Sequence, residues 1–457
     1  MADALPSTPW WREMTRYHWF VFIVAAVGWL ADCMDQQLFV LTRDDALSEL
    51  MGLPASDDAV RKAGGTATAI FLMGWAIGGL VFGVMGDRVG RVRTMLITIV
   101  LYSVFTGISI FATGFWDYSL YRFLTGLGVG GEFAVGVALV AEVMPSRARP
   151  YTLGMLQAFS AIGNCLAALI YIGLGMLEMN GGLKGLTLLG LPLTGWRIAF
   201  LIGTIPAAVA LLVRRKLKEP ERWVEAKDQK RGSYTELFGD VRWRRHAFLG
   251  LGLGFAAVVG LWGIGFFGVQ LAKTVFHENF KAGGMSGNEL AGNVKIWGGL
   301  YSFFLNLGAG FGMIYFGYLA QALSRRMAFF LSFLAAMIAT AATFWLFNDA
   351  SMVFWLTPIM GFCLLSLFAG LAIYLPELFP TRLRSTGVSF CYNVGRFVAA
   401  WGPYTFGFLT GSVFSEAHGY GKVEGLRYAG VVMCSIFLIG IAVLPFAPET
   451  KGKPLPE

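Results

Sequence analysis

Charged residues are scarce in this chain: Asp, Glu, Lys and Arg make up only 14% of its 457 residues, against about 25% in typical soluble proteins. Hydrophobic residues make up 56% of the chain, and apolar runs of about 20 residues recur from end to end. Each run is long enough to cross a hydrocarbon core of ~30 Å as a helix. The composition therefore excludes a soluble protein and predicts an all-α polytopic membrane protein.

Residues that bind metals or act as nucleophiles are also few. The four histidines lie at the ends of predicted spans or in loops: His18, His246, His277 and His418. The five cysteines lie inside predicted spans, without metal-binding spacing: Cys33, Cys165, Cys363, Cys391 and Cys434. No Ser/His/Asp arrangement is evident either, so we expect no enzyme activity, no cofactor and no metal site.

The apolar runs predict twelve transmembrane helices with both chain ends on one side of the membrane. The predicted spans are 17–41, 65–86, 94–114, 117–141, 151–177, 195–214, 246–272, 294–318, 327–347, 351–375, 386–413 and 427–447. The first run is too long for a secretory signal and lacks a small-residue cleavage site. The spans form two six-helix bundles, residues 1–214 and 246–457, joined by a polar linker, residues 215–245.

The net charge of +8 is explained by the positive-inside rule, because Lys and Arg gather in cytoplasmic loops. Residues 214–245 are rich in both, whereas the loop expected at residues 42–65 holds more acids than bases. The linker and both termini are therefore expected in the cytoplasm, with the protein a monomer in the cell (inner) membrane. No nucleic-acid partner is expected.

The two halves carry a repeated motif. "EVMPSRAR" begins at Glu142, and "ELFPTRLR" begins 235 residues later at Glu377. The same offset carries "GVMGDRVGRVR" to within one residue of "GYLAQALSRR", which matches Asp87 with Gln321 and Arg91 with Arg325. Parallel repeats of six helices are typical of transporters with a substrate site near the midplane between the halves.

Several motifs together resemble the major facilitator superfamily over the whole chain. "GVMGDRVGR" resembles its loop motif between helices 2 and 3, and "YRFLTGLGVGGE" resembles the helix-4 motif of sugar porters and related metabolite:proton symporters. "KEPERW" and "PETKGKPL" resemble sugar porters, whereas "DCMD" in helix 1 and "CYNVGRF" in helix 11 are similar to aromatic-acid and sialate-type proton symporters. Helix 7 lacks the paired glutamines of sugar porters and offers only Gln270.

Ionisable residues inside the membrane are costly, so they face a cavity or a partner. At ~1.5 Å per residue, Asp35 and Arg122 fall within about one turn of the same depth in the outer half. In sugar porters the aspartate aligned with Asp35 is the proton site and the arginine aligned with Arg122 is its partner. The resemblance thus implies a proton-coupling pair, with Asp32 on the same helix face sharing or tuning the proton. The alternative is that both aspartates cap a frayed helix end in water.

Two further charged residues lie near the predicted midplane. Glu132 is a candidate second proton site or substrate contact, or a purely structural hydrogen-bonding group. Arg396 carries a permanent charge that needs an anion, either Glu132 of the other half, a substrate carboxylate, or both in turn.

Softer candidates for substrate binding are polar or aromatic residues of the predicted spans. They are Gln157, Asn164, Gln270, Asn306, Tyr392 and Asn393, with Trp262, Trp297 and Tyr301 as aromatic candidates.

The repeated loop motifs supply a candidate cytoplasmic gate. The family uses such charges as inter-helix salt bridges that hold the inner side shut. The predicted gate residues are Asp87, Arg88, Arg91, Glu142, Arg147, Arg149, Glu377, Arg382 and Arg384.

These patterns predict a proton-coupled symporter of a small organic anion, such as a mono- or aromatic carboxylate, that works by rocking of the two bundles. A proton-coupled sugar transporter and a non-transporting membrane sensor are the alternatives.

Overall fold

The computed structural model describes residues 9–54, 57–183, 185–188, 190–205, 217–225, 232–399, 401–415 and 418–456. Ten helical stretches within these ranges are long and apolar enough to cross a membrane, which confirms the polytopic helical class. The other two predicted spans, 195–214 and 386–413, each include residues outside the described ranges. The predicted boundary between the first bundle and the linker, at residues 214 and 215, lies outside them as well.

The first half consists of helices that follow the predicted spans closely. They are α1 (Arg16–Met51), α2 (Asp58–Arg88), α3 (Arg91–Ile108), α4 (Phe115–Val143), α5 (Arg149–Met179) and α6 (Gly195–Gly203). Short 3-10 turns, η1 (Trp10–Glu13) and η2 (Ser109–Phe111), precede α1 and follow α3. A two-residue hairpin, β1 (Thr187–Leu188) with β2 (Leu191–Pro192), lies between α5 and α6.

The second half follows two short helices, α8 (Glu221–Glu225) and α9 (Tyr234–Gly239). Its long helices are α10 (Val241–Gly260), α11 (Phe266–Ala282), α12 (Gly287–Ala322), α13 (Arg325–Leu346), α14 (Leu356–Leu378) and α15 (Arg384–Ala399). They are followed by α16 (Gly402–Phe408), α17 (Lys422–Met433) and α18 (Ile436–Val443). The remaining turns are η4 (Leu261–Gly265), η5 (Ala350–Phe354), η6 (Thr381–Leu383), η7 (Leu409–Val413) and η9 (Leu444–Phe446), of which η4 and η7 are π-helical.

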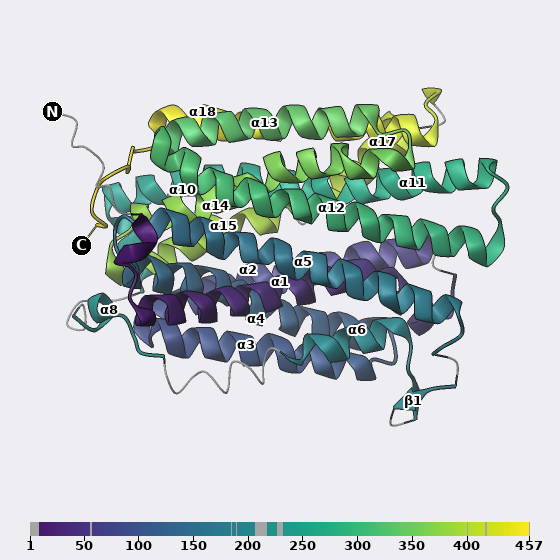
Figure 1. Ribbon diagram of the computed structural model, residues 1–457, viewed down its shortest axis with the longest axis horizontal. Coiled ribbons are helices and arrows are strands. Elements are labelled where there is room, and N and C mark those ends of the chain that lie inside the picture. Colours follow the sequence, from purple (N-terminus) through teal and green to yellow (C-terminus); the bar gives the residue numbers. More distant parts are fainter. Residues whose placement is uncertain are drawn as a thin grey trace.

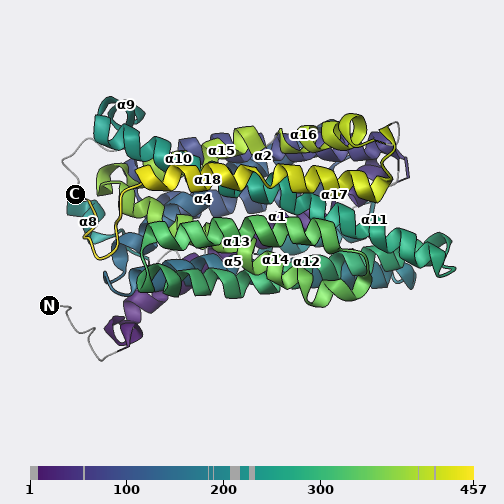
Figure 2. The ribbon, with the colours of Figure 1, turned by 90° about the horizontal axis from the view of Figure 1, so that it is seen from above.

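The helices run side by side along the long axis, with the first half below and the second half above in Figure 1. The halves meet along two seams, α5 against α12 and α2 against α15. Figure 2 shows α10, α15 and α2 lying along one another in the same way. Small residues allow close packing within each half: a Cβ added at Gly78 of α2 would lie 2.0 Å from the Leu127 carbonyl oxygen of α4.

The two ends of the bundle differ in what they hold. The terminal end contains η1, α8, α9 and the last described residues (Figures 1 and 2). The distal end contains the β-hairpin and the junction of α11 with α12 (Figure 1). The repeated loop motifs lie at the terminal end, where Arg147 forms an ion pair with Glu13 of η1.

Two helices extend past their predicted ends into polar sequence. α1 continues to Met51 and ends at Gly52, whose left-handed φ of 65° stops the helix. α11 likewise continues to Ala282. Much of the predicted acidic loop, residues 42–65, is therefore helical, because a helix continues through polar residues of adequate propensity once it leaves the apolar region.

Candidate functional site

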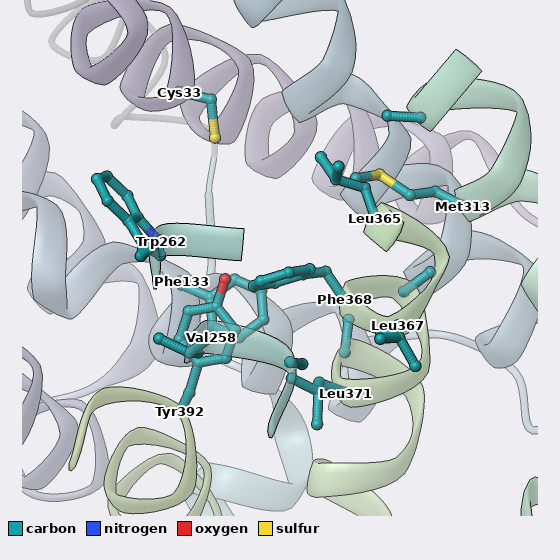
Figure 3. Packing of buried hydrophobic residues seen from close by; sticks show 14 of the residues in the cluster. Cys33, Phe133, Val258, Trp262, Met313, Leu365, Leu367, Phe368, Leu371 and Tyr392 are labelled. Atoms are coloured by element: carbon teal, nitrogen blue, oxygen red, sulfur yellow. The ribbon is translucent and has the colours of Figure 1, made fainter. Parts of the chain in front are cut away.

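A cavity of about 2240 Å³ lies between the halves and opens at the distal end. Five of the predicted substrate residues line it, together with Asn306, Trp262 and Tyr301: Arg396, Gln270, Gln157, Asn164 and Tyr392. Its apolar wall comes from both halves, with Cys33 of α1 opposite Met313, Leu365 and Phe368 (Figure 3). The cavity thus combines a wide apolar surface with a few polar groups, as small-molecule sites do.

Arg396 lies at the deep end of this cavity. Its guanidinium lies 3.9 Å from the ring centroid of Trp75 and 4.3 Å from that of Tyr392. Its Nη1 donates to the Tyr392 carbonyl oxygen (2.7 Å) and to Asn393 Oδ1 (3.1 Å). No ion pair joins it to Glu132 or to any other acid of the described residues. The hydrogen-bond and ring partners of this buried cation are thus all neutral, and its side chain lines the cavity.

Asn393 has a different position from the one predicted. It is fully buried beside the cavity, and its Nδ2 donates to Ser389 Oγ (3.0 Å) while its Oδ1 accepts from Arg396. It therefore orients the guanidinium. Tyr392 in turn stacks on Phe133 of α4 with ring centroids 3.8 Å apart. This stack joins the two halves (Figure 3).

Asp32 and Glu132 are buried acids close to the cavity without lining it. Asp32 Oδ2 accepts a 3.1 Å hydrogen bond from Gln36, and Gln36 itself lines the cavity. Neither carboxylate oxygen of Glu132 has a partner within the described ranges. A void of about 10 Å³ lies beside Glu132, and Trp29 borders both this void and the large cavity. The void has room for about one water molecule.

Asp35 and Arg122 are fully buried in the first half, outside the cavity. Asp35 accepts from Thr106 (3.0 Å), and Arg122 donates to Ser109 (2.5 Å). Thr106 and Ser109 are only three residues apart, so Asp35 and Arg122 lie within about one helical turn of the same depth. No ion pair joins the two charges. The Arg122 guanidinium stacks 4.4 Å from the centroid of Phe200 of α6.

The terminal end is closed by a buried ion network between the halves. Glu142 accepts from Arg91 Nη2 (2.9 Å) and from Arg384 Nη1 (2.8 Å). Asp87 pairs with Arg91 and accepts from the backbone and hydroxyl of Thr386, at 2.8 and 2.5 Å. All four ionic side chains are fully buried. Asp87 of α2 and Glu142 of α4 thus both bind residues of α15 in the other half.

The other predicted gate residues make contacts mainly within one half. Glu377 pairs with Arg325 (2.9 Å), and Arg382 pairs with Glu236 of α9 (2.7 Å). Arg147 pairs with Glu13, as described above. Arg88 donates to the Gly232 carbonyl oxygen (3.0 Å), and Arg149 is buried at the start of α5.

In each half, one acid that follows the last span caps the N-terminus of an earlier helix of the same half. Glu219 accepts from the backbone N–H of Arg91, the first residue of α3, at 2.7 Å. Glu449 accepts from the N–H of Arg325, the first residue of α13, at 3.0 Å. Partial burial raises the pKa of Glu449, but N–H donors of Lys451, Arg325 and Arg326 stabilise its carboxylate, so the net shift of the pKa is downward.

At the distal end, sequence reasoning missed two lysines that line the cavity. Lys295 of α12 bridges to Asp45 of α1 (2.8 Å) and Glu178 of α5 (3.1 Å), across the α5–α12 seam. Lys273 of α11 lies beside it. The signal was a lysine at the edge of a predicted span: Lys273 directly follows the span 246–272, and Lys295 is the second residue of the span 294–318.

Comparisons with known proteins agree with this architecture. Residues 50–403 match the model of the Major Facilitator Superfamily. The chain is 29% identical over 449 residues to a putative metabolite transport protein of Haemophilus influenzae, covering 97% of this chain and 99% of the relative. It is also 29% identical over 447 residues to a probable 4-methylmuconolactone transporter of Cupriavidus pinatubonensis (97% and 93% covered). A cis,cis-muconate transport protein of Acinetobacter baylyi is 28% identical over 392 residues (84% of each chain).

Among solved structures, a proton:xylose symporter bound to 6-bromo-6-deoxy-D-glucose superposes with a TM-score of 0.73. The alignment covers 96% of this chain and 98% of the symporter, at 19% identity. At this identity the likeness shows the fold alone.

Proposed function

The chain belongs to the major facilitator superfamily of membrane transporters, and from this premise we propose that it is a proton-coupled symporter of a small organic anion. It is a transporter and not an enzyme. The proposed transport uses two bundles, residues 1–214 and 246–457, that rock about the substrate site. The relatives named for 4-methylmuconolactone and cis,cis-muconate support a carboxylate or related organic acid as substrate.

The observation that carries the proposal is the environment of Arg396. A buried guanidinium needs an anion, and its described partners are carbonyl oxygens and aromatic faces. Trp75 and Tyr392 bring an aromatic surface to the same place, which suits a flat carboxylate such as an aromatic acid. The planar guanidinium would hold such a carboxylate at two points.

Proton coupling is assigned to the buried acids of the first half. Asp35 beside Arg122 is the proposed main proton site, because separation of a carboxylate from a guanidinium in a dry site favours protonation. Asp32 contacts the cavity through Gln36, and Glu132 has an adjacent void, so both are proposed to share the proton path. The ion network of the terminal end serves as the gate, with that end in the cytoplasm and the chain in the inner membrane.

Uptake by proteoliposomes under an imposed proton gradient tests the substrate class. The panel holds benzoate, cis,cis-muconate, a sugar acid and D-xylose. We expect uptake of a carboxylate. Uptake of D-xylose alone would make the protein a sugar symporter.

Substitution of Arg396 tests the role of this residue directly. Arg396→Lys keeps the charge but loses the two-point contact, so it should bind the carboxylate weakly. Arg396→Gln should bind at least about 100-fold more weakly, because loss of one member of a buried pair costs roughly 3–5 kcal/mol. Glu132→Gln combined with Arg396→Gln is the control, measured by binding heats on purified protein. Full affinity in this double variant would show that Arg396 only neutralises Glu132.

Asp35→Asn tests the proton site separately. The variant should lose accumulation against a gradient while it still exchanges substrate across the membrane. Thr106→Val is a matched control, because it removes only the hydrogen bond to Asp35 and should lower coupling less. Normal accumulation by Asp35→Asn would place the coupling elsewhere, at Asp32 or Glu132.

A further inference from the structure

One face of α11 carries basic residues along the cavity wall. Lys273, His277 and Lys281 are each four residues apart, which places them on one side of the helix, and all three line the cavity. Gln270 continues this row toward the deep end of the cavity. Glu278 and Glu289 also line the mouth, so the charges of this surface are of both signs.

Lys273 is held in place by the neighbouring helix. A Cβ added at Gly298 of α12 would lie 2.8 Å from Cε and 3.3 Å from Cγ of Lys273. The alkyl chain thus lies across the glycine, where any larger residue would displace it. This support directs the ammonium group toward the cavity that Lys273 lines.

The acids closest to Lys273 already have partners. Asp44 pairs with Arg43 (3.1 Å), and Asp45 pairs with Lys295 (2.8 Å). No hydrogen bond or ion pair to Lys273 itself is present in the part of the chain that the structure describes. Three N–H donors of an ammonium group are therefore available to a ligand in the cavity.

Lys273 is too far from Arg396 for both to hold one small anion. Arg396 stacks on Trp75, whose ring centroid lies 5.5 Å from that of Trp262. From residue 262 to 273 the helix rises roughly 16 Å. The two cations therefore define separate positions, one in the outer cavity and one at its deep end.

We propose that Lys273 is an anion-capture site in the outer cavity, which binds a carboxylate of the incoming substrate before it reaches Arg396. The substrate class rests on the proposed function, whereas the site itself rests on the placement of Lys273. A fixed cation in a cleft with low-dielectric walls raises the local anion concentration and the rate of association. In a second interpretation, Lys273 pairs with Asp44 or Asp45 when the distal end closes and binds no ligand.

The test measures charge selectivity at a reporter thiol and needs no transported substrate. The five native cysteines are replaced by serine, and Gln270→Cys, which is exposed one turn from Lys273, supplies the reporter. Reaction rates are measured with an anionic sulfonatoethyl and a cationic trimethylammonioethyl methanethiosulfonate. Lys273→Gln should lower the ratio of anionic to cationic rates about threefold or more, as expected for a unit charge at short range.

Two variants serve as controls for this measurement. Lys273→Arg should retain the ratio, because it keeps the charge. Arg427→Gln removes a positive charge from the distal end outside the cavity, where Arg427 donates to the Phe347 carbonyl oxygen, and should leave the ratio unchanged. An unchanged ratio in Lys273→Gln overturns the capture site. An equal change of both rates also overturns it and assigns Lys273 to closure of the distal end.

Uptake of cis,cis-muconate then links capture to transport. Lys273→Gln should raise KM several-fold and leave the maximal rate nearly unchanged, because Lys273 is remote from Arg396. If no carboxylate is transported by the parent protein, the proposed substrate class fails while the reporter thiol still decides the capture site. An unchanged KM beside a lowered rate ratio would overturn its role in substrate capture.

Discussion

The terminal end buries its charges completely, whereas the distal end leaves them partly in water. The side chains of Arg91 and Glu142 are 0% exposed, but those of Lys295 and Asp45 are 21% and 33% exposed. Both networks join the two halves. The ion pairs between the halves are therefore strong at the terminal end and weak at the distal end. This is expected for a molecule that is closed at its terminal end and open at its distal end.

Burial explains why the two networks differ in strength. Removal of one member of a buried ion pair leaves a charge without compensation and costs roughly 3–5 kcal/mol. An exposed pair contributes only about 0–1 kcal/mol, because water screens both charges. The comparison therefore gives a graded set of expected effects, largest at Glu142 and smallest for added salt at the distal end.

Glu142→Gln should break the closed terminal end most strongly, because it leaves both Arg91 and Arg384 buried without their shared carboxylate. A thiol introduced as Ser389→Cys, at the fully buried α2–α15 seam, reports opening through its rate of maleimide labelling. We expect an increase of at least about 100-fold, from a loss of roughly 3 kcal/mol. The matched control is Glu377→Gln, whose pair with Arg325 stays within the second half, and an equal increase there would contradict the comparison.

Asp87→Asn should open the same seam less. The amide keeps one acceptor oxygen but loses the charge-assisted bonds from Arg91 and Thr386, at about 1.5–3 kcal/mol. Labelling of Ser389→Cys should therefore rise on the order of tenfold. The counterpart in the second repeat is Gln321, and Gln321→Ala should leave labelling unchanged. A comparable rise of labelling in both variants would contradict the different roles assigned to Asp87 and Gln321.

Lys295→Gln should loosen the distal part of the α5–α12 seam slightly. The native Cys165 lies at this seam, with its Sγ 3.5 Å from the Phe303 carbonyl oxygen. Its labelling should rise at most about fivefold, the equivalent of ~1 kcal/mol. Labelling of Ser389→Cys should not change, and a rise at that position would mean that the two ends are tightly coupled.

Added salt should change the labelling rates less than any of the substitutions, and it should act at the distal end only. An increase from 0.1 M to 1 M shortens the screening length from about 10 Å to about 3 Å. Labelling of Cys165 should rise up to about twofold, because the Lys295 pairs are partly exposed. Labelling of Ser389→Cys should stay constant, and salt sensitivity there would show that water enters the terminal network.

The repeat indicated from the sequence alone which charges gather at one end, but not which partners they choose. Two motifs that share Glu, Pro and two Arg at the same spacing predict equivalent contacts in both halves. In the structure Arg384 crosses to Glu142, whereas Glu377 stays with Arg325. The first repeat has an acid, Asp87, where the second has Gln321, and this acid binds Thr386 across the α2–α15 seam. The motif alone does not reveal how α15 meets α2.

Distances along a helix could be predicted, whereas directions around it could not. The rise per residue indicated similar depths for Asp35 and Arg122, and the structure places them at adjacent levels. It also interposes Thr106 and Ser109, which the rise could not reveal. The contact of Arg396 with Trp75 escaped prediction for the same reason, because it depends on the rotation of two helices from different halves.

The caps formed by Glu219 and Glu449 have a consequence for biosynthesis. The N-terminus of α3 binds a carboxylate that lies 128 residues later in the chain, and that of α13 binds one 124 residues later. A ribosome therefore delivers each cap only after the last span of the same half has emerged. Until then the first N–H groups of α3 and α13 lack these acceptors. Each half is thus completed by its own trailing segment, so the first can mature while the second is still being translated.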